Sequence, residues 1–151
     1  MTKFWRNWLT IWCWGVVGFG VLLAGAGFPA TQAPTQLLLT ILYDGGAVEL
    51  DQLARFAVGL MGALTMAMGL LMGIGIGAAD TLGTAGAPVW RRLVMAAAAW
   101  YLVDSAISCA NGFTLNAVSN TLIMIAFLIP VLASGVLRGV DRVSAGMTDA
   151  A

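Results

Sequence analysis

Polar side chains that could bind a ligand are concentrated in two neighbouring apolar segments in the C-terminal half of the chain. The candidate set consists of Asp104, Ser108, Asn111, Asn116, Ser119 and Asn120. The first three are spaced i, i+4 and i+7, which places them on one face of a helix, and Asn116 and Asn120 repeat the i, i+4 spacing. A carboxylate beside hydroxyl and amide groups could hold a cation, a proton or a small polar molecule.

The same set is poorly equipped for catalysis. It has no second titrating group beside the carboxylate, and no nucleophile paired with a base. The sequence contains no histidine, which excludes His-ligated haem, His-based zinc sites and His general bases. Cys13 and Cys109 are far apart and both lie in apolar segments, so they are expected to be buried thiols. We therefore predict no enzymatic activity, no metal and no cofactor.

A turn at Gly112 should fold the two segments into a hairpin. This hairpin would bring Asp104 and Ser108 roughly level with the polar pair at positions 119 and 120. Two interpretations follow. The side chains could hydrogen-bond between the helices, at about 0.6 kcal/mol each in a membrane. Alternatively, they could form an outward-facing binding site on the order of 10 Å below the surface.

Composition indicates that lipid surrounds these segments. The chain is 60% hydrophobic and only 9% charged, whereas soluble domains are about 45–50% apolar and about 25% charged. A carboxylate inside a bilayer costs roughly 2.5–3.5 kcal/mol, so Asp104 is the strongest pointer to a functional site. The formal net charge is zero, and no basic cluster exceeds a pair, which excludes nucleic acid as a partner.

Four apolar runs long enough to span a bilayer are predicted, at about 8–28, 53–78, 91–110 and 115–137. The run from Thr35 to Tyr43 is too short and predicts an interfacial or re-entrant helix between spans 1 and 2. Asp51 is predicted to cap the second span, and Pro130 to free a carbonyl and kink the fourth. Residues 1–151 would then form one all-α domain, an integral membrane four-helix bundle.

The first run has a second interpretation, as a cleaved signal peptide, because Lys3 and Arg6 precede it and small residues occupy positions 24–26. The run is longer than a signal core, however, and its start is rich in tryptophan, as an interfacial aromatic belt would be: Trp5, Trp8, Trp12 and Trp14. Cleavage would leave three spans.

Charge predicts the orientation. The basic residues that fall on one side of the four spans are Lys3, Arg6, Arg91, Arg92, Arg138 and Arg142. The other side holds Asp44, Glu49 and Asp51, with Arg55 as its basic residue. Because basic flanks stay on the cytoplasmic side, we expect both termini in the cytoplasm and the protein in the inner (plasma) membrane.

Gly69, Gly73 and Gly77 recur every four residues and would let another helix approach closely. That helix could belong to the same chain or to a second copy, and the sequence leaves both open.

Three short motifs carry a resemblance: residues 53–62, Val103-Asp104-Ser105, and residues 115–120. Together they resemble an uncharacterised type of small four-span bacterial inner-membrane protein. The resemblance implies the four-span topology and a bacterial source, and it carries no activity. We therefore expect a multi-pass membrane protein without catalytic activity, an accessory subunit of a larger membrane complex or a homo-oligomer. The alternative is a small transporter or cation-binding protein that uses Asp104.

Overall fold

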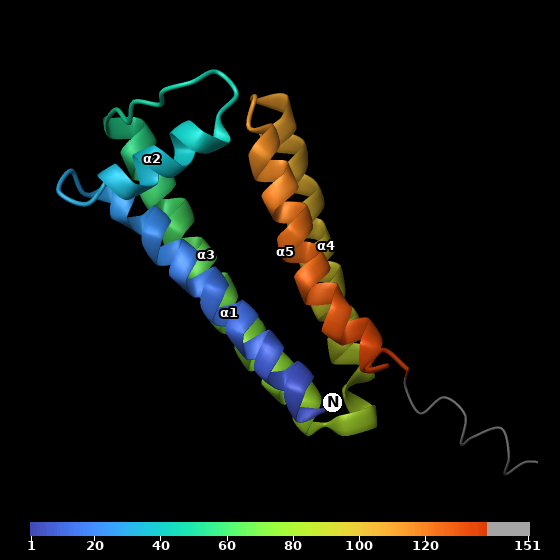
Figure 1. Cartoon of the computed structure of the whole chain (residues 1–151). Helices are drawn as coiled ribbons and strands as arrows, with labels where there is room; N and C mark the ends of the chain where they lie inside the picture. The colour runs from blue at the N-terminus through green and yellow to red at the C-terminus, as the bar shows by residue number, and fades with distance from the viewer. Residues whose placement is uncertain (139–151) are drawn as a thin grey trace, which may run out of the picture.

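The computed structural model describes residues 1–138. Its helices are α1 (Lys3–Ala24), α2 (Ala33–Leu42), α3 (Gln52–Thr81), α4 (Ala87–Ala110) and α5 (Thr114–Ala133), with 3-10 turns at Gly25–Gly27 and Gly83–Gly86 (Figure 1). No strand occurs within these residues. Arg142, one of the basic residues used to predict the orientation, lies outside the described residues.

The predicted all-α fold with four long apolar helices is confirmed. The helix ends differ from the predicted spans. α1 begins at Lys3 rather than near residue 8, and Thr2 is its N-cap, whose hydroxyl accepts a long hydrogen bond from the backbone N–H of Trp5 at 3.5 Å. α5 ends at Ala133 rather than near residue 137, because Gly135 follows it in the left-handed region with φ +63°.

The connections are short and well defined. Asp51 caps α3 as predicted, since its carboxylate accepts a hydrogen bond from the backbone N–H of Ala54 at 2.7 Å. Pro88 lies in the first turn of α4, where a missing N–H costs nothing. Gly112, with φ +75°, makes the tight turn that joins α4 to α5.

The long helices pack as two pairs, α1 along α3 and α4 along α5, and the pairs touch through α3–α4 and α1–α5 contacts (Figure 1). Each long helix contributes to one buried apolar core. Leu9 of α1, Trp90 of α4 and Phe127 of α5 are fully buried there, beside Met72 of α3.

Glycine brings the backbones of α1 and α3 together. A Cβ built on Gly20 would lie 2.8 Å from the carbonyl oxygen of Gly62, and one built on Gly62 would overlap the backbone of Ala24. A Cβ on Gly59 would lie 3.0 Å from the Cα of Gly27. No larger residue fits at these positions without separating the helices.

The predicted stripe of Gly69, Gly73 and Gly77 belongs only in part to this close contact between α1 and α3, which we call the glycine seam. A Cβ on Gly69 would lie 3.0 Å from the carbonyl oxygen of Cys13, and one on Gly73 would be in ordinary contact with the Cys13 side chain at 3.8 Å. At Gly77 a Cβ would meet nothing within 4 Å. Steps of four residues rotate around an α-helix by about 40° each, so the third member of the stripe turns away from α1.

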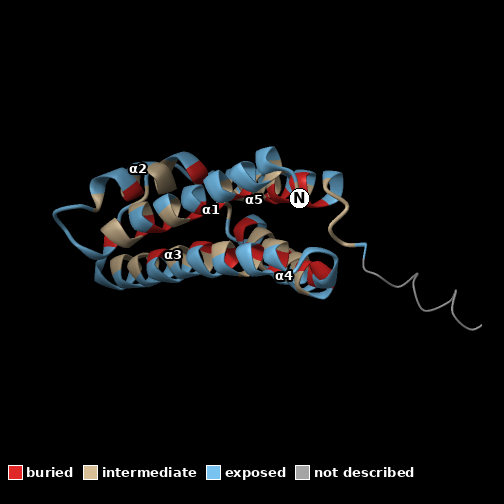
Figure 2. Ribbon diagram, turned by 90° about the horizontal axis from the view of Figure 1, so that it is seen from below, coloured by how far each residue is buried: buried red, intermediate tan, exposed pale blue. Residues whose placement is uncertain are grey.

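The outward faces of the long helices are apolar. Buried residues face neighbouring helices and exposed ones lie on the outer sides (Figure 2). Ile11, Leu64 and Ile74 are 72%, 65% and 69% exposed. Similar side chains cover every long helix: Trp14 and Val21 on α1, Leu60 and Leu71 on α3, Leu102, Val103 and Ile107 on α4, and Leu122, Ile125 and Leu132 on α5.

Candidate polar site between α4 and α5

Asp104, Ser108 and Asn116 form a chain of hydrogen bonds across the α4–α5 hairpin. The Asn116 side-chain N–H donates to the hydroxyl oxygen of Ser108 at 2.8 Å. The Ser108 hydroxyl in turn donates to Oδ1 of Asp104 at 3.5 Å, a long and weak bond. Ser108 is buried, whereas Asp104 and Asn116 are half-buried. The structure therefore brings these three predicted residues together.

Asn120 lies level with Asp104 and is 4% exposed. Its place follows from the Ser108–Asn116 bond, because moving back one turn on α4 and forward one turn on α5 leads from that pair to Asp104 and Asn120. The side-chain nitrogen of Asn120 is buried and has no hydrogen-bond partner in the described part of the chain. A buried amide without a partner is costly and uncommon in native proteins.

A further polar contact lies one turn deeper. The hydroxyl groups of Tyr101 and Thr121 are 3.1 Å apart and share a hydrogen bond. Below it, Trp100 lines a small apolar pocket together with Trp12, Met68, Met72, Ala96 and Ala97. Polar contacts thus run from the turn at Gly112 down the hairpin and end at Tyr101.

Two predicted members of the site point elsewhere. The Ser119 hydroxyl donates to the carbonyl oxygen of Leu115 in its own helix at 3.0 Å, because it lies about 60° around α5 from Asn116. Asn111 follows the last residue of α4, and its side chain donates to the carbonyl oxygen of Ile107 at 2.8 Å. Both side chains thus donate to backbone carbonyl oxygens four residues earlier in the chain. The remaining members of the candidate site are Asp104, Ser108, Asn116 and Asn120.

No cation neutralises the Asp104 carboxylate within residues 1–138, where both ion pairs involve Asp80. No cluster of three or more His, Cys, Asp or Glu side chains that could hold a metal ion occurs in the same residues. The site is thus one carboxylate surrounded by neutral hydroxyl and amide groups. It can bind a ligand through charge and hydrogen bonds.

Asp44 ties the segment after α2 to the outer end of the hairpin. Its carboxylate accepts hydrogen bonds from the Thr114 hydroxyl at 2.8 and 2.9 Å and from the Thr114 backbone N–H at 3.3 Å. The Asp44 N–H donates to the carbonyl oxygen of Gly112 at 2.8 Å, and the ring of Tyr43 packs 4.9 Å from that of Phe113. From the sequence, Asp44 was only one of the acidic residues of one side, and nothing in the sequence indicated this partner, which is 70 positions away.

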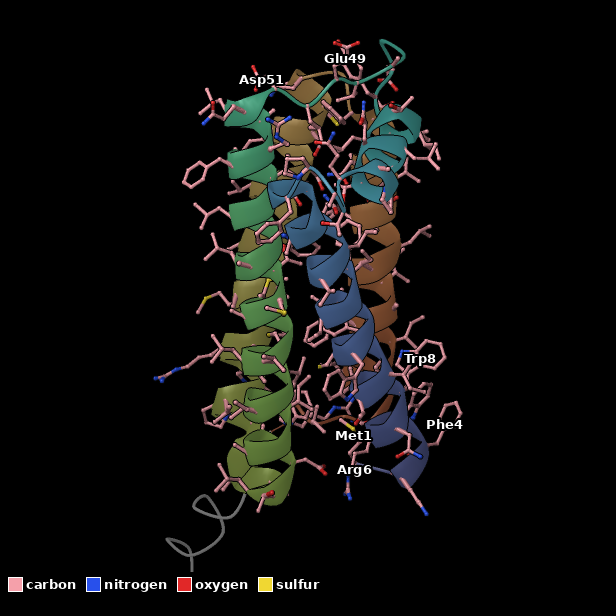
Figure 3. All side chains as sticks on the ribbon, turned by 90° about the vertical axis from the view of Figure 1, so that its left-hand side faces the viewer. Met1, Phe4, Arg6, Trp8, Glu49 and Asp51 are labelled. Carbon is pink, nitrogen blue, oxygen red and sulfur yellow. The ribbon has the colours of Figure 1, made fainter. Side chains whose placement is uncertain are left out.

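Asp80 forms an ion cluster at the opposite end of the molecule. The Arg6 guanidinium lies 2.7 Å and the Met1 amine 3.3 Å from its carboxylate. Met1 and Arg6 lie at one end of the molecule and Glu49 and Asp51 at the other (Figure 3). A helix C-terminus disfavours a carboxylate such as Asp80, and the two cations offset that. Nothing in the sequence indicated that Asp80 and Arg6 form an ion pair.

Tryptophan side chains join α1 to α5. Trp8 donates from its indole nitrogen to the carbonyl oxygen of Ala126 at 2.8 Å, and Trp12 donates to that of Ile123 at 3.0 Å. Ala126 lies four residues before Pro130, which has no N–H to donate to it. The carbonyl that Pro130 was expected from the sequence to leave without a donor is thus the one that Trp8 binds. The kink predicted at Pro130 stays a prediction.

Comparison of the chain with protein-family models, with curated proteins and with solved structures found no match.

Proposed function

We propose that the protein is a multi-pass integral membrane protein without catalytic activity, a four-helix bundle that serves as an accessory subunit of a larger membrane complex. The observation that carries the proposal is the distribution of side chains. Apolar residues such as Leu64 and Ile74 face outward, whereas Ser108 and Asn120 are buried. Water would not solvate such an outer surface, whereas lipid does.

We propose that the protein lies in the inner (plasma) membrane, and the charges support an orientation with both termini in the cytoplasm. Met1 and Arg6 lie at one end of the molecule and Glu49 and Asp51 at the other (Figure 3). Lys3 begins α1 at the Met1 end. Arg91 and Arg92 lie in the first turns of α4, shortly after Asp80, which pairs with Met1. α2 has 10 residues, about 15 Å, and is too short to cross the bilayer. We propose that it lies in the outer interface.

The glycine seam favours the accessory role over glycine-mediated self-association. α1 of the same chain already occupies the surface at Gly62 and Gly69, and the 3-10 turn after α1 occupies it at Gly59. A second copy or a different subunit would therefore bind elsewhere, on the apolar outer faces.

Topology is tested by cysteine labelling. Cys13 and Cys109 are replaced by alanine, and a single cysteine is introduced at the exposed position Ala47 or Thr84. A membrane-impermeant maleimide should label Ala47→Cys in intact cells and Thr84→Cys only after permeabilisation. Labelling of both sites in intact cells, or recovery of the chain from the soluble fraction without detergent, would contradict the membrane proposal.

The accessory role is tested by purification of the tagged chain from native membranes in mild detergent. A stoichiometric second protein that survives high salt supports the role. Recovery of this chain alone, or only with further copies of itself, argues against it.

The second candidate function is that of a small transporter or ligand-binding protein. One observation favours it: the buried amide of Asn120, level with Asp104, has no partner within the described residues. Asp104→Asn should then abolish binding or transport and leave folding intact. If the substitution changes neither, the polar residues serve packing alone.

A further inference from the structure

We propose that the polar residues between α4 and α5 bind one monovalent metal cation, Na⁺ or K⁺, through the Asp104 carboxylate and the neutral oxygens of Ser108 and Asn120. The inference deepens the second candidate function and rests on the membrane placement of these helices. It concerns binding, and it names the class of ligand that the site accepts.

The charge of the site selects a monovalent ion. Asp104 has no basic partner among residues 1–138, where both ion pairs involve Asp80. In a medium of low dielectric constant an isolated carboxylate is costly, and a single positive charge beside it removes most of that cost. Calcium and magnesium sites collect more oxygen ligands or retain several waters and commonly use further carboxylates, which this site lacks.

The available side-chain atoms are oxygens, the ligands that hard cations prefer. The Ser108 hydroxyl donates its hydrogen to Asp104 and accepts the Asn116 N–H with one lone pair, so its second lone pair remains for a cation. The side-chain nitrogen of Asn120 has no hydrogen-bond partner within the described residues. Turning its amide by about 180° therefore breaks no hydrogen bond of that nitrogen and presents the carbonyl oxygen where the unpaired nitrogen now lies.

Asp104 lies nearer to the Ala110 end of α4 than to its start at Ala87. It lies about 9 Å along the helix axis from the end of α4 at Ala110. Asn116, which is hydrogen-bonded to Ser108, lies between Asp104 and that end. On the deeper side the Tyr101–Thr121 hydrogen bond closes the polar seam, and the apolar pocket around Trp100 offers no oxygen ligand. We expect an ion to enter and leave from the Ala110 end of α4, as in a binding site.

The experiment measures ²²Na⁺ binding to the purified full-length chain in detergent, with unlabelled Na⁺, K⁺ and choline as competitors at constant ionic strength and pH. We expect one saturable site per chain, displaced by unlabelled Na⁺ or K⁺ and unaffected by choline. Asp104→Asn should abolish binding. Asn120→Ala should weaken it about tenfold, as loss of one neutral ligand would.

Two variants keep the result interpretable. Asp44→Asn removes a carboxylate from the same end of the molecule and should bind normally. If Asp104→Asn elutes as an aggregate, Asn120→Ala decides, since it leaves the carboxylate in place. Binding that is absent from the native chain, or unchanged in Asn120→Ala, overturns the proposal. The proposal is also overturned if Asp104 takes up a proton as the pH falls to the same extent in Na⁺, K⁺ and choline salts. That result would make Asp104 a proton site. The labelling and fractionation experiments decide membrane placement independently of any ion.

Discussion

The indole nitrogen of Trp8 lies 2.8 Å from the carbonyl oxygen of Ala126, the acceptor that Pro130 leaves without its usual helical donor. One residue of α1 thus completes the hydrogen bonding of α5. In an apolar surrounding an unpaired carbonyl is costly, so the proline and the tryptophan form one unit.

Trp8→Phe keeps most of the ring and removes the donor. We expect it to lower the free energy of unfolding by about 1 kcal/mol. In a Pro130→Ala background the new backbone N–H can donate to Ala126, so the same substitution should cost less. Thermal or denaturant unfolding in detergent measures both, with Trp14→Phe as control because Trp14 is 63% exposed. An equal cost of Trp8→Phe in both backgrounds would show that the two residues act independently.

Gly62 and Gly77 lie on the same helix and should respond to alanine in opposite directions. A Cβ at Gly62 would overlap the backbone of α1, so Gly62→Ala should destabilise the fold by about 1–3 kcal/mol. Gly77 has open space around it, and Gly77→Ala should stabilise α3 by about 0.5–1 kcal/mol. Melting temperatures of the two purified variants test this. A loss of stability at Gly77 would place a neighbour there, as in an oligomer.

Asp80 and Arg6 should be energetically coupled. The Asp80 side chain is 12% exposed and that of Arg6 57%, so we expect Asp80→Asn to cost about 1 kcal/mol and the cost to shrink in high salt. Arg6→Gln should lower stability in the native chain and have little further effect with Asp80→Asn. Glu49→Gln, which changes an exposed carboxylate, serves as the control. Additive effects of Arg6→Gln and Asp80→Asn would rule out the coupling.

Asp44 caps α5 from another segment of the chain. Asp44→Ala should cost about 1 kcal/mol and speed amide exchange at Thr114. Asp51→Ala removes the cap of α3 and should speed exchange at Ala54 without affecting Thr114. Hydrogen–deuterium exchange of both variants measures the difference. Unchanged exchange at Thr114 in Asp44→Ala would mean that this cap contributes nothing in solution.

Features that depend on neighbouring residues could be predicted from the sequence. Apolar run length identified the four long helices, and Gly112 identified the turn between α4 and α5. Once that turn is placed, helical spacing puts Ser108 near the amides of α5, which is why the pair with Asn116 could be approached from sequence. Ser119 was misplaced because a hydroxyl can satisfy itself on its own helix, an option that spacing does not reveal.

Contacts between distant residues could not be predicted. Trp8 and Ala126 are 118 positions apart, and only the packing of α1 against α5 brings them together. The tryptophans at the start of α1 have the composition of an aromatic belt, and composition does not show whether an indole faces lipid or a carbonyl. The ion pair of Asp80 with Arg6 was also out of reach. Arg6 lies on α1, and the sequence does not show how α1 is aligned along α3.

α3 and α5, which belong to different pairs, differ in length. α3 has 30 residues, about 45 Å, whereas α5 has 20 residues, about 30 Å, close to the thickness of a bilayer's hydrocarbon layer. Both fit one layer only if α3 tilts, and Figure 1 shows the α1–α3 pair inclined to the α4–α5 pair. Lipids with longer acyl chains would draw the first pair upright and leave the second too short, so acyl-chain length should change the angle between the pairs.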